Sequence, residues 1–195
     1  KAVGIDMYII PMSDPHRGEY IPEHWQIISW LTGFTGSAGT VVVTDSHAGL
    51  WTDARYFIQA VRQLSGSGFE FMRPGQYQRN DYMDFVAENA KPGDKIGIDG
   101  KIFQFSAFRR LEKRLEGKNV VIDVNCDLIS PLWSGRPSLP FSMAFDHLPE
   151  YAGKTRAEKI GEVRSRMKKM MAGYHFLSYL DDILWVLNIR GNDLQ

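Results

Sequence analysis

The chain has 195 residues, enough for one domain of ordinary size plus part of another, with a substantial buried core. Its 23 basic and 23 acidic residues balance, so its charge favours neither a nucleic acid nor a membrane as a partner. No apolar run approaches the roughly 20 residues that span a bilayer, and a single cysteine, Cys126, excludes an internal disulfide. We therefore expect a globular protein of a reducing compartment, the cytoplasm.

The first element is a short apolar run at residues 5–10, which predicts a central strand. A polar, turn-rich loop at residues 13–20 follows it. Ligand groups usually lie in loops that follow a strand of an α/β sheet, so His16, Arg17 and Glu19 are candidates for a site. The alternative interpretation is an ordinary solvated loop.

A glycine-rich bend comes next, between an amphipathic helix at residues 25–31 and an apolar strand at residues 40–44. A nucleophile elbow needs glycine two residues before its serine, but Ser37 has Thr35 there. A dinucleotide-binding fingerprint follows a strand and opens a helix, whereas these glycines follow a helix and open a strand. The glycines at every third position of residues 33–39 therefore indicate close packing of the backbone.

A second hairpin strand at residues 49–52 leads into a helix for which Asp53 is a plausible N-cap. Arg55 lies in the first turn of that helix, where a cation opposes the helix dipole. It therefore needs a compensating partner or a task. An ion pair with Asp53 or Glu19 is the structural interpretation, and contact with a substrate is the functional one.

The rest of the first domain alternates strands and helices, which favours a three-layer α/β fold with a mixed sheet flanked by helices. The basic outer side of the helix at residues 105–115 is typical of a solvated face. Strands are expected at residues 69–72, 95–99 and 119–124, helices at residues 81–89, 105–115 and 127–133, and a turn at residues 74–75.

A proline-rich stretch places the domain boundary near residues 149–153, giving a first domain at 1–152 and an incomplete second domain at 153–195. A helix at residues 155–172 opens the second domain, with Lys159 on an ordinary charged surface. Residues 173–177 repeat the glycine-then-strand pattern of the first strand, and Asp181 and Asp182 fit an N-cap and first turn. We expect a duplicated helix–strand–helix unit that is only half built, so the chain is expected to be part of a larger protein.

Catalytic and metal-binding patterns do not occur in the sequence. The histidines are scattered singly, without a His-Glu-x-x-His pattern or a cysteine pair, so no metal ligand and no catalytic residue is assigned. The carboxylate pairs lie in settings that do not shift a pKa toward acid–base catalysis. The histidines are His16, His24, His47, His147 and His175.

Several local patterns recur in an order that resembles a known family. Residues 18–21 (Gly-Glu-Tyr-Ile), 33–40 (Gly-Phe-Thr-Gly-Ser-Ala-Gly-Thr) and 50–57 (Leu-Trp-Thr-Asp-Ala-Arg-Tyr-Phe) resemble the N-terminal domain of three-domain Xaa-Pro aminopeptidases. Residues 180–191 resemble the opening of the second domain of these enzymes. The resemblance implies a creatinase/prolidase-type N-terminal domain with a ribonuclease H-like motif, followed by the truncated start of a similar domain.

The resemblance also implies a function for the full-length protein. Such enzymes release the first residue of a peptide when proline follows, using a C-terminal pita-bread domain with two metal ions, usually manganese, held by two Asp, two Glu and one His. None of that domain is expected here, so the chain alone is expected to be inactive. Its domain would rim the cleft, restrict access to the peptide's amino end and contribute to assembly, as a homodimer. The rim candidates are His16, Glu19, Tyr20, Arg55 and Tyr56.

Two other functions remain open from the sequence. Creatinase-like N-terminal domains also resemble those of histone-chaperone subunits, which bind peptides or histones without cleaving them. A free-standing hydrolase is the third possibility, and it predicts turnover by this chain. We expect none.

Overall fold

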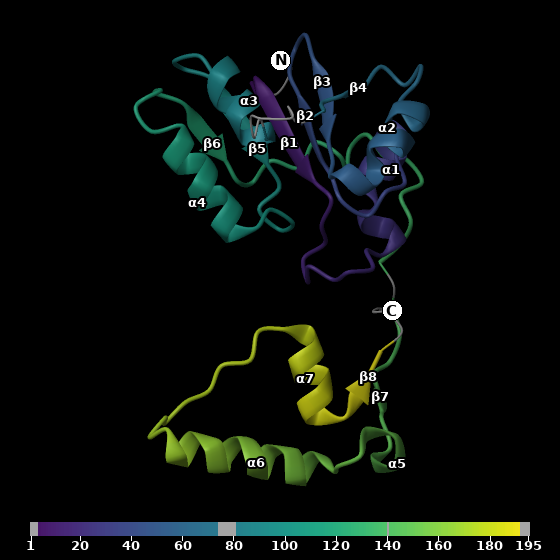
Figure 1. Cartoon of the computed structure of the whole chain (residues 1–195), viewed down its shortest axis with the longest axis vertical. Coiled ribbons are helices and arrows are strands. Elements are labelled where there is room, and N and C mark those ends of the chain that lie inside the picture. Colours follow the sequence, from purple (N-terminus) through teal and green to yellow (C-terminus); the bar gives the residue numbers. More distant parts are fainter. Residues whose placement is uncertain (1–3, 74–80, 140, 192–195) are drawn as a thin grey trace. The chain divides into compact units, whose positions relative to one another are not determined.

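Six strands build one mixed sheet, the middle layer of the first part of the chain (Figure 1). The structure is a computed structural model that describes residues 4–73, 81–139 and 141–191. The sheet order is β4-β3-β2-β1-β5-β6, in which β1–β2 and β2–β3 pair antiparallel and the other neighbours pair parallel. The strands are β1 (Met7–Pro11), β2 (Thr40–Val43), β3 (Ala48–Trp51), β4 (Glu70–Phe71), β5 (Lys95–Ile98) and β6 (Val121–Asp123).

Successive side chains of a strand point to opposite faces of the sheet. Helices cover both of these faces. Met7 and Ile9 pack with α3 (Tyr82–Asn89) and α4 (Phe105–Arg114). Tyr8 and Ile10 pack on the other face with α1 (Ile27–Thr32) and α2 (Phe57–Gln63). Short 3-10 helices, η1 (Glu23–Trp25) and η2 (Ala54–Tyr56), precede α1 and α2. The expected three-layer α/β fold with a mixed sheet is confirmed.

The short helix expected at residues 127–133 is not formed. One carboxylate oxygen of Asp127 accepts the backbone N–H groups of Ile129 (3.0 Å) and Ser130 (2.9 Å). An aspartate that bonds its own following amides offers the backbone an alternative to a helix, and Pro131 removes a donor from the next turn. These residues form turns instead. The turn expected at residues 74–75 lies outside the described residues.

Arg136 fixes the end of the first unit against η1. Its guanidinium lies 5.0 Å from the ring centre of Trp25 and 5.3 Å from that of Trp133, and Trp30 stacks on Trp133 at 4.8 Å. The Nε group of Arg136 donates to the carbonyl oxygen of His24 at 2.8 Å. Cation–π contacts of this kind contribute about 0.5–2 kcal/mol each. The last residues of the first unit are therefore held against η1 by aromatic packing.

Contacts divide the chain into two compact units, Lys1–Ser138 and Leu139–Gln195. The sequence predicted the boundary near residues 149–153. The contact division comes earlier because β7 (Phe145–Asp146) pairs antiparallel with β8 (Ile189–Arg190), near the end of the described chain. The proline-rich stretch thus contains a strand of the second unit.

The second unit contains α5 (Pro149–Ala152), α6 (Arg156–Lys169) and α7 (Leu180–Leu187). Thr155 caps α6 in a capping box with Glu158. The N-cap of α7 is Tyr179, so Asp181 and Asp182 both lie in its first turn and neither is the cap. No helix in the described ranges is long and apolar enough to cross a membrane.

The strand expected at residues 173–177 is not formed. Tyr174 is 97% exposed and Phe176 is 88% exposed, and within the described residues no strand pairs with this segment. A strand needs neighbours to satisfy its backbone and to cover its apolar face. The repeat in the sequence was therefore insufficient to predict a strand here.

Lys159 of α6 is only 2% exposed, although the sequence placed it on a charged surface. Its Nζ donates to the side-chain oxygen of Asn188 (2.6 Å) and to the backbone oxygen of Trp185 (2.9 Å). The same nitrogen lies 4.3 Å from the ring centre of Trp185. Asn188, in the left-handed conformation that ends α7, donates in turn to the carbonyl oxygen of Lys154 at 2.8 Å. One buried amine thus links α6 to α7.

Candidate functional site

The loops that carry the expected rim residues lie at one end of the sheet. Pro11, the last residue of β1, pairs with Thr40, and Thr40 pairs with Trp51, the last residue of β3. β5 runs parallel to β1, so its final residue Ile98 lies at the same end. The backbone N–H of Met12 also donates to the carbonyl oxygen of Gly39 at 2.9 Å. The loop after β1, the glycine bend and the start of η2 therefore meet there.

The glycine bend is shaped by packing around Phe34, which is fully buried. α1 ends at Gly33, whose φ of 76° lies in the left-handed region that favours glycine. A Cβ at Gly36 would lie 2.3 Å from the Phe34 ring and 2.9 Å from the Tyr56 ring. Only glycine fits without displacing these rings. These distances support the packing interpretation of the glycines.

Tyr56 lies across the bend from Ser37, and their hydroxyl oxygens are 2.6 Å apart. The hydrogen bond from Ser37 lowers the pKa of the Tyr56 phenol, because it stabilises the phenolate. The Tyr56 ring also meets Phe34 edge to face at 5.9 Å. The buried side of Tyr56 is thus fixed by packing, and its hydroxyl group faces the surface.

Arg55 forms a two-pronged ion pair with Asp53. Its Nε lies 2.9 Å and its Nη2 lies 2.7 Å from the two carboxylate oxygens of Asp53. This hydrogen bonding holds the pKa of Asp53 below its usual value. The guanidinium also lies 5.2 Å from the ring centre of Tyr56. Asp53, and not Glu19, is therefore the partner of Arg55, and both members of the pair are exposed.

The loop after β1 is organised by Asp14, which is 1% exposed. One of its oxygens accepts the N–H of Gly18 at 3.0 Å, and its backbone oxygen accepts the N–H of Arg17 at 3.1 Å. His16, Glu19 and Tyr20 are near or on the surface, and within the described residues their side chains make no hydrogen bond or ion pair. The structure thus presents these rim candidates unpaired. Among the described residues, no hydrogen bond or ion pair joins them to Arg55 or Tyr56.

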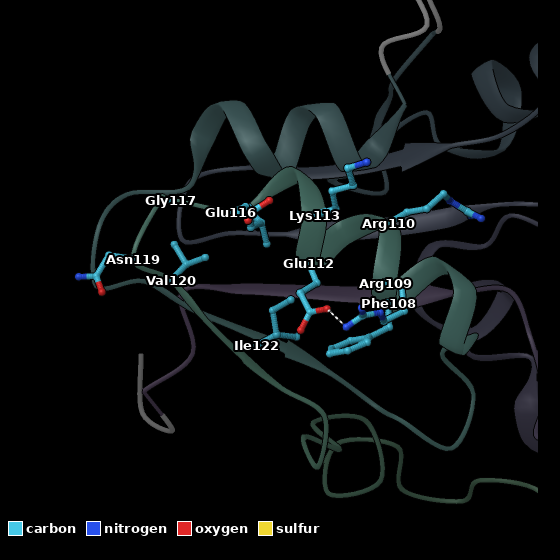
Figure 2. Close-up of a pocket in the computed structure, with 11 residues that line it drawn as sticks. Phe108, Arg109, Arg110, Glu112, Lys113, Glu116, Gly117, Asn119, Val120 and Ile122 are labelled. Carbon is cyan, nitrogen blue, oxygen red and sulfur yellow. Dashed lines mark hydrogen bonds and ion pairs between the residues drawn. The ribbon is translucent and has the colours of Figure 1, made fainter.

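Two hollows line α4, and the sequence predicted neither. Figure 2 shows the larger, of about 940 Å³, between α4 and β6, where Phe108 and Ile122 face an ion pair of Arg109 with Glu112 at 2.5 Å. The smaller, of about 320 Å³, lies between the loop after β1 and the start of α4. Arg17 lines the smaller hollow, and Arg110 lines both. The sequence feature that could have indicated the smaller hollow is a pair of basic residues, Arg17 and Arg110, in segments that follow two parallel strands.

In the part of the chain that the structure describes, no group of three or more His, Cys, Asp or Glu side chains could hold a metal ion. Cys126 is buried, and burial raises the pKa of its thiol.

The comparisons with known proteins decide the family. A model described as the creatinase/prolidase N-terminal domain matches residues 1–126, and a second model of the same description matches residues 135–195. The chain belongs to this family. The creatinase/prolidase N-terminal domain is the one that the segments at residues 18–21, 33–40 and 50–57 resembled, so that prediction is confirmed.

Relatives of this creatinase/prolidase N-terminal domain are aminopeptidases. The chain is 39% identical to aminopeptidase P2 of Arabidopsis thaliana, covering 98% of this chain and 27% of that protein. It is 36% identical to a probable Xaa-Pro aminopeptidase P of Talaromyces stipitatus, covering 100% of this chain and 30% of the relative. It is also similar to the crystal structure of an X-prolyl aminopeptidase from Caenorhabditis elegans, described as a cytosolic enzyme with a di-nuclear active site. The TM-score is 0.85 at 32% identity, over 97% of this chain and 31% of that one.

The hydrogen bond between Ser37 and Tyr56 gives a prediction for the site. Replacing Ser37 with alanine is expected to raise the pKa of Tyr56 toward the ordinary value of a tyrosine, because the phenolate loses its donor. The ultraviolet absorbance of the phenolate, followed with pH, measures this. A Tyr56→Phe variant identifies which part of the titration belongs to Tyr56.

Ser46→Ala, in the exposed β2–β3 turn, is the matched control and should leave the titration unchanged. If the titration is the same in Ser37→Ala and in the unaltered chain, the hydrogen bond does not act on Tyr56.

Proposed function

We propose that this chain supplies the N-terminal, non-catalytic region of an Xaa-Pro aminopeptidase, an enzyme that releases the first residue of peptides with proline in second position. The observation that carries the proposal is the similarity of nearly the whole chain to such enzymes, at 39% and 36% identity. The chain spans about 30% of these relatives, so catalysis is assigned to the remainder of the protein.

The proposed reaction needs metal ions, for which we propose two manganese ions held by the catalytic domain. When bound, they would activate water for attack on the peptide carbonyl. We assign none of the metal ligands to this chain; its described residues include no group of three or more His, Cys, Asp or Glu side chains that could hold an ion. Its own task would be to limit the room around the amino end of the peptide. The di-nuclear active site described for the Caenorhabditis elegans relative supports the proposal of two metal ions.

The exposed groups at one end of the sheet suit that task. A peptide's α-amino group is cationic below a pKa of about 8, and Glu19 is a surface carboxylate without an ion pair among the described residues. We assign Glu19 to orient the amino end, and His16 and Tyr20 to border it. Arg55 and Tyr56 would form a second wall, held in place by Asp53 and Ser37. The homodimer and the cytosolic location are part of the same proposal.

Cleavage of an Xaa-Pro peptide with added manganese tests the proposal, using both this chain and the full-length protein. We expect cleavage by the full-length protein and none by the chain alone. In the full-length protein, Glu19→Gln should raise KM about ten-fold with little change in kcat, since it removes a binding contact worth about 1.4 kcal/mol. Glu116→Gln, which also removes one exposed carboxylate, is the matched control.

The outcomes separate the proposed function from its competitors. Hydrolysis by the purified chain would contradict the assignment of catalysis to the remainder of the protein. A full-length protein that binds peptides but does not cleave them with any divalent metal would instead be a binding module. Sedimentation of the full-length protein measures whether it is a dimer.

A further inference from the structure

The smaller hollow beside α4 has the features of an anion-binding pocket. It has a volume of about 320 Å³, near the lower end of the range for small-molecule sites. It opens at the end of the sheet where the parallel strands β1 and β5 finish, the usual place for ligands in α/β sheets. Its polar side chains come from separate segments, namely Ser13, Arg17, Thr40, Tyr82, Gln104 and Arg110.

The charged side chains that line this pocket are both cationic. Arg17 and Arg110 line it, whereas no aspartate or glutamate does. Among the described residues, neither guanidinium forms an ion pair with a carboxylate. The other arginines of α4 are paired, Arg109 with Glu112 and Arg114 with Asp81 at 2.8 Å. Figure 2 shows Arg109 turned toward Glu112 and Arg110 extended the other way.

The pocket also holds one guanidinium in place. Arg17 has a φ of 58°, in the left-handed region, and its backbone N–H is bonded to the carbonyl oxygen of Asp14. With the amide oxygen of Gln104 turned toward it, that oxygen accepts from both terminal nitrogens of Arg17, at 3.2 and 3.1 Å. A guanidinium fixed before the ligand arrives loses less entropy on binding.

The start of α4 adds to the same field. Gln104 is the N-cap of this ten-residue helix, and its side chain makes no capping hydrogen bond, so the first amides of α4 are left without a side-chain acceptor. Such amides and the helix dipole favour an anion. The dipole and the two arginines therefore act in the same direction.

We propose that this pocket binds a small anion through a carboxylate or phosphate group, with Arg17 and Arg110 as its two cationic contacts. Both groups present several anionic oxygens to a planar guanidinium, which pairs with them through two parallel hydrogen bonds. The pocket is separate from the role proposed for Glu19 and does not depend on peptide cleavage.

Isothermal titration of the 195-residue chain tests the pocket, with succinate and inorganic phosphate as separate probes. We expect saturable binding of at least one probe, weakened at least ten-fold by Arg17→Gln and by Arg110→Gln. The stronger probe identifies the group: succinate indicates a carboxylate ligand, and phosphate indicates a phosphate ligand. Lys113→Gln is the matched control, since Lys113 lies on the same helix and lines the larger hollow but not this pocket.

Lys113→Gln should change the affinity less than two-fold. Circular dichroism melts of each variant check that the fold is kept, which is expected because the replaced side chains are exposed. The proposal is overturned if neither probe binds saturably, or if all three variants weaken binding equally, because the binding would then follow overall charge.

Discussion

Replacing Phe34 with alanine is expected to lower the free energy of unfolding of the first unit by about 3–5 kcal/mol. Phe34 is fully buried beneath the glycine bend, where its ring meets Tyr56 and fills the space beside Gly36. The loss combines the transfer of an aromatic ring out of water with the cavity left behind. Urea denaturation followed by tryptophan fluorescence measures it, and Trp30 and Trp51 lie in the same unit.

Phe105→Ala is the matched control for this prediction. Phe105 opens α4 and is 76% exposed, so the same chemical change there should alter stability by no more than about 0.5 kcal/mol. Equal effects of the two substitutions would show that the Phe34 site is not the packed core that the structure describes. Loss of the bend should also release the Ser37–Tyr56 hydrogen bond.

Replacing Lys159 with methionine is expected to destabilise the second unit by about 2–3 kcal/mol. Methionine keeps much of the apolar stem but leaves the side-chain oxygen of Asn188 without its donor, and the backbone oxygen of Trp185 keeps only the 3.4 Å bond from the N–H of Asn188. The removal of a buried charge offsets part of this loss, because Lys159 is almost wholly buried. We expect the loss to exceed that offset, because the amine also lies against the Trp185 ring.

Hydrogen exchange of the α6 and α7 amides measures this effect locally. Lys168→Met, at an exposed position of α6, is the control and should leave the exchange rates within about two-fold of the unaltered chain. If Lys159→Met exchanges no faster than Lys168→Met, the buried amine does not hold the two helices together.

The sequence predicted the elements whose signals are local. The apolar runs of β1 and β2 and the periodicity of α4 lie within single segments, and the structure has these elements. The elements of the second unit were harder to predict from the sequence, because whether residues 173–177 form a strand depends on partners distant in the chain. The prediction that Lys159 lies on the surface was wrong for the same reason. A lysine with charged neighbours in the sequence is typical of a surface, and only the packing of a second helix buries it.

The candidate site also could be predicted only where its contacts are local in sequence. The ion pair of Arg55 with Asp53 spans two residues and was one of the interpretations open from the sequence. The pocket of Arg17 and Arg110 joins segments that are far apart in sequence, and it depends on the parallel pairing of β1 with β5. A loop and a helix can each be predicted as basic, but their convergence is a property of the fold.

The outer strands of the six-stranded sheet are short, with two residues in β4 and three in β6. A longer open margin would offer a row of unpaired amides and carbonyls on which another chain could build. With so few such groups at either margin, this sheet offers little on which a strand of another chain could pair and start a fibril.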